Sequence, residues 1–266
     1  MTRRILANHA HVFEESVRAH ATVDRLLELM DRCGIEQAVC FAPFPGQMAS
    51  DQDARNRWLA REIVSQDRLY GFGTVDFRQP NIAEQVKEIY GLGLKGIKIH
   101  PAHQKVNVLS PESFEMYHAA AEYGLFLSFH TGLHWHRLKD YDALMFDEIA
   151  YQLPQLKFSM EHVGGYSFFP EALAVIVNNI RTGHVYGGLT SVFTTHVSRA
   201  FRLSQERLDE LVAQAGAGRL MFGIDFPYNQ VAETKVGIET IENMQVTEEE
   251  KDLMLGGTLR QALGIQ

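Results

Sequence analysis

Polar residues stand at the ends of several short apolar runs, where buried strands are expected to end. Because the carboxyl ends of parallel strands in a closed barrel meet at one mouth, side chains at these positions would come together. Imidazoles and a carboxylate gathered in this way form a site for a divalent metal, and a metal with an open position generates hydroxide near neutral pH. The residues concerned are His9, His11, Lys98, His100, His130, His162 and Asp225.

His9 and His11 give the most specific local signal. Residues two apart in a strand point to the same side, so both imidazoles would face the barrel interior and could bind one ion. Taken alone, the pair could equally be two structural histidines, each of which would need hydrogen-bond partners. Their position at the end of the first strand, together with the other strand ends, favours metal ligation.

His130 and Asp225 end later strands. His130 is followed by Thr131 and Gly132, a tight turn that would leave the imidazole at the mouth, although a lone histidine after an apolar run is usually a core residue. An isolated carboxylate such as Asp225 is costly at the end of a buried strand unless it is paired or ligating. Asp225 is therefore expected to bind the metal and to accept a proton from bound water.

His162 is expected to be a further ligand or a group that polarises the water or the substrate. The alternation of strand side chains places Met160 and His162 on one face and Glu161 on the other. Glu161 is therefore expected to face the surrounding helices and not the metal.

Four residues are candidates for substrate contact. Inside a barrel, Lys98 would have a lowered pKa unless an anion is near. It could bind a substrate carboxylate, be carboxylated to bridge two metals, or form an internal ion pair. His100 shares its face, and Trp135 and Arg137 lie in the loop after His130, which could bind an anionic or aromatic substrate or be loosely packed. The remaining histidines without such a context are expected to be structural or superficial: His20, His103, His184 and His196.

Length and composition are typical of one large domain spanning residues 1–266. The chain has 266 residues, of which 45 % are hydrophobic, and a formal net charge of -8. No tract rich in lysine or arginine is present, which argues against nucleic acid or an anionic membrane as a partner.

Cys33 and Cys40 have neither a zinc-ligand nor a disulfide spacing and are expected to be buried, reduced thiols. The absence of a signal-peptide core and of a membrane-length apolar run indicates a cytoplasmic enzyme.

The fold expected from the pattern of elements is a (β/α)8 barrel. Eight strands alternating with helices imply parallel pairing through right-handed crossovers, and about 250 residues is the usual size of this barrel. A doubly wound open sheet is the alternative, but its first strand normally leads into a glycine-rich phosphate turn, and here it ends at His9 and His11. Strands are predicted near 5–11, 37–42, 69–75, 95–100, 125–130, 156–162, 184–190 and 219–225. Helices are predicted at 22–32, 53–65, 82–90, 112–123, 146–153, 171–179 and 204–214, with two more after residue 234.

The polar motifs at the strand ends, in their order along the chain, resemble those of the amidohydrolase superfamily. The resemblance is strongest to the branch of amidohydrolase-2 proteins and aminocarboxymuconate-semialdehyde decarboxylase-like enzymes. The resemblance covers nearly the whole chain, from Ile5 to about Tyr228. Beyond the histidine pair, it is carried by residues 154–158, which lead into the segment 162–165, and by residues 219–227.

The resemblance implies a site with one divalent metal, usually zinc, with manganese as an alternative. The metal ligands implied by motif position are His9, His11, His130 and Asp225, and the activating histidine is His162. The branch often has an aspartate two residues before the first histidine, where this chain has Ala7, so the groups that support the ligands are expected to differ. Lys98 stands where some other branches have a carboxylated lysine, which leaves a second metal open.

The leading hypothesis is a metal-dependent hydrolase that acts on a carbonyl of an ester, lactone or amide in a small, carboxylated substrate. A non-oxidative decarboxylase using the same site is the alternative, since the branch contains both kinds of enzyme. A barrel that binds a metal or metabolite without catalysis is a third, non-enzymatic interpretation. The partner is expected to be a small molecule, and a homodimer is possible.

Overall fold

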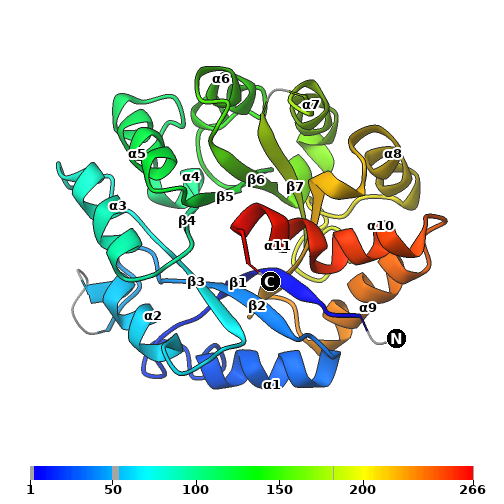
Figure 1. Cartoon of the computed structure of the whole chain (residues 1–266), viewed down its shortest axis with the longest axis horizontal. Coiled ribbons are helices and arrows are strands. Elements are labelled where there is room, and N and C mark those ends of the chain that lie inside the picture. The colour runs from blue at the N-terminus through cyan, green and yellow to red at the C-terminus, as the bar shows by residue number, and fades with distance from the viewer. Residues whose placement is uncertain (1–2, 50–53, 182, 266) are drawn as a thin grey trace.

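The computed structural model describes residues 3–49, 54–181 and 183–265, and it contains a closed barrel of parallel strands. The strands pair in sequence order, and β8 closes onto β1 (Figure 1). This order has no switch point, so the predicted (β/α)8 barrel is confirmed and the doubly wound sheet is excluded. The strands are β1 (Leu6–His11), β2 (Gln37–Phe41), β3 (Leu69–Gly73), β4 (Gly96–Ile99), β5 (Phe126–His130), β6 (Lys157–Glu161), β7 (His184–Thr190) and β8 (Leu220–Phe226).

Helices follow the strands and surround the ring (Figure 1). Each predicted helix has a counterpart, although α7 begins earlier than expected, the short α4 was not predicted, and the C-terminal segment has three helices, α9, α10 and α11, where two were predicted. The predicted start of the second helix, at Asp53, lies outside the described residues. The helices are α1 (Val23–Cys33), α2 (Arg55–Ile63), α3 (Ile82–Gly91), α4 (Pro101–Gln104), α5 (Pro111–Glu122), α6 (Met145–Gln152), α7 (Gly165–Asn178), α8 (Gln205–Ala215), α9 (Val231–Glu242), α10 (Glu248–Asp252) and α11 (Thr258–Leu263). Short 3-10 turns η2 (Leu138–Asp140), η3 (His162–Gly164) and η4 (Ala217–Arg219) and a π-helical turn, η5 (Leu253–Gly257), complete the structure.

Local sequence signals explain where several helices begin and end. The Thr22 hydroxyl accepts a hydrogen bond from the backbone of Arg25 at the start of α1, and Gly34 ends that helix with a φ of 68°. Thr247 and Glu250 form a reciprocal capping box at the start of α10. Such caps satisfy backbone groups that would otherwise lack partners at helix termini.

The apolar core has two layers, one between the strands and the helices and one inside the barrel. In the outer layer the rings of Phe129, Phe146 and Phe158 pack edge to face or tilted, and each buried phenylalanine contributes roughly 1.5–3 kcal/mol. In the inner layer Leu6 packs in a cluster with Leu259 of α11, so this helix covers the end of the barrel where the strands begin. The opposite end, where the strands finish, is left as the mouth.

The backbone leaves strand geometry at several of these strand ends. His9, His162, Ser191 and Asp225 have φ values of 67°, 64°, 58° and 53°, a region that residues other than glycine rarely occupy. The pairing of β1 with β2 also shifts register between Ala7 and Ala10. Such conformations carry a local free-energy cost, and they concentrate here at the barrel mouth.

The two cysteines are both free: Cys40 is buried, and Cys33 is only partly buried. Burial raises the pKa of the Cys40 thiol to about 12, so this group is an unreactive core residue. Within the described ranges, no helix has the length and apolar character needed to span a membrane.

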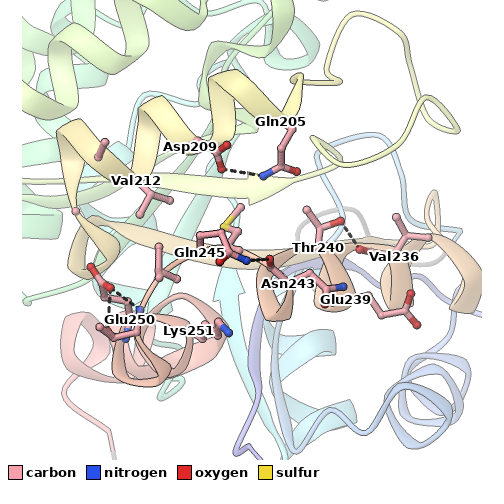
Figure 2. A pocket seen from close by; sticks show the side chains of 15 residues that line it. Gln205, Asp209, Val212, Val236, Glu239, Thr240, Asn243, Gln245, Glu250 and Lys251 are labelled. Atoms are coloured by element: carbon pink, nitrogen blue, oxygen red, sulfur yellow. Dashed lines mark hydrogen bonds between the residues drawn. The ribbon is translucent and has the colours of Figure 1, made fainter.

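A wide groove of about 1310 Å³ runs between α8 and the segment formed by α9 and α10 (Figure 2). Side chains from helices and their connections line it, including Asp209, Glu239 and Lys251, and no strand end contributes. The groove therefore lies on the outside of the barrel, away from the residues predicted to do chemistry.

Candidate metal centre and active-site cavity

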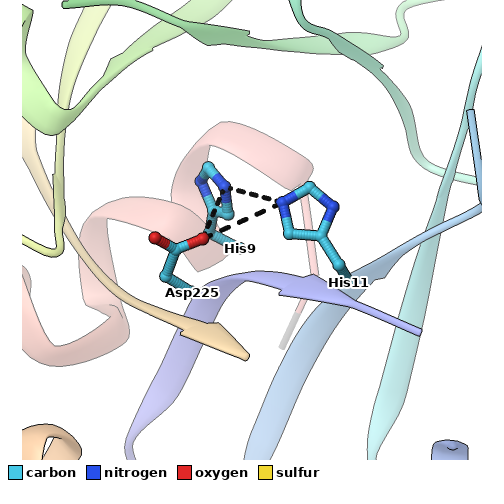
Figure 3. A group of neighbouring side chains, drawn as sticks. All are labelled: His9, His11 and Asp225. Atoms are coloured by element: carbon cyan, nitrogen blue, oxygen red, sulfur yellow. Dashed lines mark hydrogen bonds and ion pairs between the residues drawn. The ribbon is translucent and has the colours of Figure 1, made fainter. Parts of the chain in front are cut away.

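Three of the predicted ligands converge at the barrel mouth. His9 Nε2 lies 3.2 Å from His11 Nε2 and 3.4 Å from Asp225 Oδ1, and His11 Nε2 lies 3.9 Å from the same oxygen (Figure 3). All three side chains are buried, and they form the one group of potential metal ligands found in the described part of the chain. β1 supplies both histidines and β8 supplies the aspartate, and these two strands are paired.

The orientation of His9 is set by Glu161. His9 Nδ1 lies 3.0 Å from Glu161 Oε2. Because a carboxylate oxygen accepts, the Nδ1–H of His9 donates, and the lone pair of its Nε2 is left facing His11 and Asp225. Glu161 itself is fully buried inside the barrel and accepts further hydrogen bonds from Asn8 and Thr190 at 2.8 Å each.

The prediction that Glu161 faces the helices is therefore wrong. β6 ends at Glu161, and the chain then turns through the positive φ of His162, which breaks the alternation on which the prediction rested. Glu161 and Ser159 share the interior face, and Met160 packs in the outer core. Gly188 on β7 makes room for the carboxylate, because a Cβ there would lie 2.2 Å from Glu161 Oε2.

Asp225 is held by a hydroxyl and by its own turn. Ser191 Oγ donates to Asp225 Oδ2 at 2.5 Å, and Asn229 Nδ2 donates to Ser191 Oγ at 3.0 Å. These bonds leave Oδ1 free to face the two imidazoles. Burial raises the pKa of Asp225 to about 6, an effect that the Ser191 hydrogen bond and the Lys98 charge partly oppose. A carboxylate of this pKa can exchange a proton near neutral pH.

His130 and His162 form a hydrogen-bonded chain. His162 Nδ1 lies 2.7 Å from the carbonyl oxygen of Thr190, so it donates, and its Nε2 must accept from His130 Nδ1 at 3.1 Å. The lone pair of His130 is then on Nε2, which is buried and has no hydrogen-bond partner. Burial is the main cause that lowers the pKa of His162 to about 4, and it also lowers the pKa of His130. Low pKa values favour neutral rings, which this pattern of hydrogen bonds requires.

These observations show that the residues present fit a divalent metal. His9 Nε2 presents its lone pair toward His11 Nε2 and Asp225 Oδ1 at 3.2 and 3.4 Å, so two imidazole nitrogens and a carboxylate oxygen converge as the ligands of one cation would. Burial also lowers the pKa values of His9 and His11, so both rings are neutral and able to ligate. His130 is not part of this three-residue group, and its ligation remains a prediction, supported by its orphaned Nε2.

A cavity of about 220 Å³ lies above these groups. It is smaller than the roughly 300–1,000 Å³ of most ligand pockets, which indicates a small substrate. Aromatic side chains, including Phe44, Phe201 and Tyr228, form much of its wall, and among the residues that the structure describes Asp225 is the one carboxylate that lines it. Its histidines are His9, His11, His100, His103, His130, His134 and His162.

Lys98 lies below the cavity in the barrel interior. It is fully buried, its Nζ stands 5.1 Å from the centroid of the Phe41 ring, and that nitrogen has no hydrogen-bond partner. Burial lowers its pKa to about 8, against the opposing effect of Glu161 and Asp225. The binding of a substrate carboxylate by Lys98 and the carboxylation of its amine both stay predictions.

The four predicted substrate contacts divide into two groups. His100 lines the cavity, with its ring stacked on His130 at a centroid distance of 3.8 Å. Trp135 is 99 % exposed, and the Arg137 side chain lies 3.9 Å from Asp140, outside the cavity lining. The expectation that Trp135 and Arg137 stand at the cavity is not met, because only His134 of their loop turns inward.

The sequence did not predict two kinds of cavity-lining residue, one on a short helix and the others in loops. His103 was expected to be structural or superficial, yet it lines the cavity because α4 carries it there directly after the end of β4. The position of Pro101 at the first turn of a helix was the available signal for that short element. Phe201 and Tyr228 come from loops whose conformation no local pattern specifies.

A closed eight-stranded barrel with a metal-ligand set at its mouth defines a class of barrel enzymes that carry out metal-assisted chemistry. A family model described as Amidohydrolase matches residues 9–265, and the chain belongs to this family. A search of curated proteins found no match.

Solved structures with the same fold include enzymes of different reaction types. A dihydroxybenzoic acid decarboxylase from Polaromonas sp. JS666, with bound manganese and the inhibitor 2-nitroresorcinol, is 16 % identical with a TM-score of 0.73, covering 98 % of this chain and 97 % of that one. A probable 2-pyrone-4,6-dicarboxylic acid hydrolase from Acinetobacter baumannii, with citric acid bound, is 14 % identical with a TM-score of 0.72, covering 100 % of both chains. An amidohydrolase from Burkholderia multivorans with bound zinc is 16 % identical with a TM-score of 0.71, covering 99 % of this chain and 100 % of that one.

Proposed function

We propose that this protein is a metal-dependent hydrolase that activates water to attack the carbonyl carbon of an ester, lactone or amide in a small, carboxylated substrate. The observation that carries the proposal is the convergence of His9 Nε2, His11 Nε2 and Asp225 Oδ1 at the floor of a buried cavity. Nitrogen and carboxylate ligands suit zinc, and manganese is the alternative that one similar structure suggests.

His9, His11 and Asp225 would hold the metal, with His130 as the further ligand. When bound, a divalent ion with an open position polarises a carbonyl oxygen and lowers the pKa of water. Asp225, at the floor of the cavity, would accept the proton of the attacking water and pass it to the leaving oxygen or nitrogen. The products are a carboxylic acid and an alcohol or amine.

His162 is proposed to support this chemistry. Both of its ring nitrogens are engaged, with the Thr190 carbonyl and with His130. In this geometry His162 holds His130 in one tautomer and one orientation, as groups behind metal ligands commonly do. A direct contact with developing charge on the substrate would require the bond to His130 to break.

A non-oxidative decarboxylase is the second candidate. The similar decarboxylase with bound manganese motivates it, as do the aromatic walls of the cavity. In this reaction the bond between the substrate carbon and its carboxylate breaks, carbon dioxide leaves, and the carbon takes up a proton. Asp225, which lines the cavity, would supply that proton in this reaction, where a hydrolase would use it as a base.

Isotope labelling separates the two reactions. The protein loaded with Zn²⁺ or Mn²⁺ is incubated in ¹⁸O-water with a panel of carboxylated lactones, esters and amides and of hydroxybenzoic acids. A hydrolase places one solvent oxygen in the product acid, whereas a decarboxylase releases carbon dioxide and takes only a solvent proton into the organic product.

Two variants test whether turnover depends on the proposed site. Asp225→Asn is expected to lose activity, and Asp209→Asn, which changes a carboxylate in the outer groove, is expected to keep it. The proposal fails if the metal-loaded protein turns over no member of the panel, or if Asp225→Asn is as active as the unaltered chain.

A further inference from the structure

The chain makes a rare left-handed turn directly after β6. The four residues of this turn, 162–165, have φ values of 64°, 46°, 71° and 63°, and the backbone N–H of Gly165 donates to the carbonyl oxygen of His162. A turn with positive φ at both central residues and this hydrogen bond is of type I′. His162 is its first residue, so the shape of the turn decides where the imidazole lies.

Val163 is an unfavourable residue for such a turn. Glycine, asparagine or aspartate usually occupies the central positions of a type I′ turn, and a β-branched residue at positive φ is an outlier. A conformation of this kind persists only where the surrounding structure enforces it. The Val163 side chain is fully buried in the outer core, and this packing supplies part of the enforcement.

The hydroxyl of Thr131, which follows the neighbouring strand β5, holds the turn from its other side (Figure 1). Thr131 Oγ1 donates to the carbonyl oxygen of Glu161 at 2.6 Å and accepts from the backbone N–H of Gly164 at 3.0 Å. The backbone N–H of Thr131 donates to the same carbonyl oxygen at 3.3 Å. One buried hydroxyl therefore ties the residue before the turn to the third residue of the turn, and we call these two bonds the Thr131 clasp.

The two loops can approach this closely because Gly132 follows Thr131. A Cβ at Gly132 would lie 3.1 Å from the carbonyl oxygen of Gly164, and the φ of Gly132 is 95°. The sequence Thr131-Gly132 thus provides both the hydroxyl that makes the clasp and the space that it requires.

The clasp reaches the metal centre through His162. The His162 ring donates from Nδ1 to the Thr190 carbonyl oxygen at 2.7 Å and accepts at Nε2 from His130 Nδ1 at 3.1 Å. Both bonds require one position of the ring. A turn of another shape would take His162 away from His130, and His130 would then lose the partner that leaves its buried Nε2 lone pair free.

We propose that Thr131 is a positioning residue of the metal centre. Its hydroxyl holds the turn 162–165 in the left-handed form, and the turn holds His162 so that His130 presents its Nε2 lone pair to the metal. The second step rests on the proposed function, in which His130 is the further ligand. The first step concerns the turn and His162 alone, and it can be tested without metal.

The experiment compares the unaltered full chain with Thr131→Val, Thr131→Ser and Thr258→Val. Valine keeps the shape of threonine and removes the hydroxyl, whereas serine keeps the hydroxyl. Thr258 is the matched control, because its buried hydroxyl also donates to a backbone carbonyl, that of Ala217 at 3.0 Å. Thr258 begins α11, which covers the opposite end of the barrel.

Three quantities are measured for each chain. Urea unfolding gives the stability, and competition with a chromophoric chelator gives the zinc affinity. Imidazole ¹H–¹⁵N spectra of the chelator-treated chain show which ring nitrogen of His162 carries the proton. The signals that are missing from the spectrum of His162→Gln identify this ring.

Thr131→Val and Thr258→Val are both expected to be less stable than the unaltered chain, because each loses a buried hydrogen bond. Thr131→Val alone is expected to bind zinc about tenfold more weakly, which is the lower end of the effect of groups behind metal ligands. It alone is also expected to lose the Nδ1–H signal of His162. Thr131→Ser is expected to retain both the zinc affinity and the signal.

Three results would overturn the proposal. The first is a Thr131→Val chain with unchanged zinc affinity and an unchanged His162 signal. The second is an equal loss of both in Thr258→Val, which would show that general destabilisation is the cause. The third is a Thr131→Ser chain that behaves like Thr131→Val.

A measurement on the unaltered chain needs no variant to fold. The Gly164 amide donates to the Thr131 hydroxyl, so it is expected to exchange with solvent as slowly as the amides of β6. Exchange as fast as that of the exposed loop residue Trp135 would overturn the clasp.

The outcomes also separate this inference from the proposed function. An altered His162 signal with unchanged zinc affinity in Thr131→Val supports the first step and overturns the second. An unaltered chain that binds no zinc contradicts the proposed function, and the His162 signal and the Gly164 amide then still decide whether the clasp holds the turn.

Discussion

Replacement of Glu161 by glutamine is the perturbation that most directly probes how the metal ligands are held. Glu161 Oε2 accepts from His9 Nδ1 at 3.0 Å, and Oε1 accepts from Asn8 Nδ2 at 2.8 Å and from Ser128 Oγ at 3.2 Å. The side chain is fully buried, so no water replaces these partners. Glutamine keeps the shape of the side chain and removes its charge.

The structure predicts which orientation the new amide takes. Asn8 Oδ1 is buried without a partner, so the Asn8 amide can turn over and accept a hydrogen bond from the new NH₂ group. The glutamine oxygen then stays opposite His9, and what is lost is the charge that strengthens the bond to His9. Loss of such support behind a metal ligand typically weakens metal binding about 10–100-fold, or about 1.4–2.7 kcal/mol.

The assay is a competition titration of the chelator-treated chain with zinc and a chromophoric chelator. Glu161→Gln is expected to bind zinc about 10–100-fold more weakly than the unaltered chain. Ser128→Ala is the control, because it removes a donor to the oxygen that does not face His9. A zinc affinity of Glu161→Gln equal to that of the control would refute the reasoning.

Three further predictions follow from burial and packing. Burial holds the folded pKa of His162 at about 4, below the ordinary 6.5, so the unfolded chain takes up protons first as the pH falls. The stability of the metal-free chain should therefore decrease from pH 6.5 toward pH 4, by up to about 3 kcal/mol from His162 alone, and urea unfolding at several pH values measures it. Phe146→Ala should lower the free energy of unfolding by about 3–5 kcal/mol, and a smaller loss in the same urea series would show a less closely packed outer core. Gly188→Ala should weaken zinc binding by displacing Glu161, and an unchanged titration curve would contradict that contact.

The barrel could be predicted from the sequence because its signals are local. Each strand is a short apolar run, each helix has its own apolar face, and caps such as Thr22 and Thr247 mark where helices begin. Strand order followed from the regular alternation of the two kinds of element. The predicted convergence of His9, His11 and Asp225 depended only on this order and on the ends of the strands.

Details that depend on where a strand stops could not be predicted in this way. Glu161 was assigned to the wrong face because the rule of alternation holds only within a strand, and β6 ends at that residue. His162 reaches the mouth through a backbone conformation that is rare outside glycine, which sequence patterns do not indicate.

The orientation of side chains in loops could not be predicted from the sequence either. Trp135 and His134 are neighbours in the sequence, yet only the latter turns into the cavity. Long-range packing decides such orientations, and no period in the sequence records it.

The central claim is that His9, His11 and Asp225 hold one divalent metal at the barrel mouth. Its most direct test is elemental analysis and zinc titration of the full chain beside His11→Ala and Asp225→Ala. The account predicts binding of one equivalent by the unaltered chain and its loss in both variants. Zinc binding that is absent from the unaltered chain, or that survives in both variants, would contradict it.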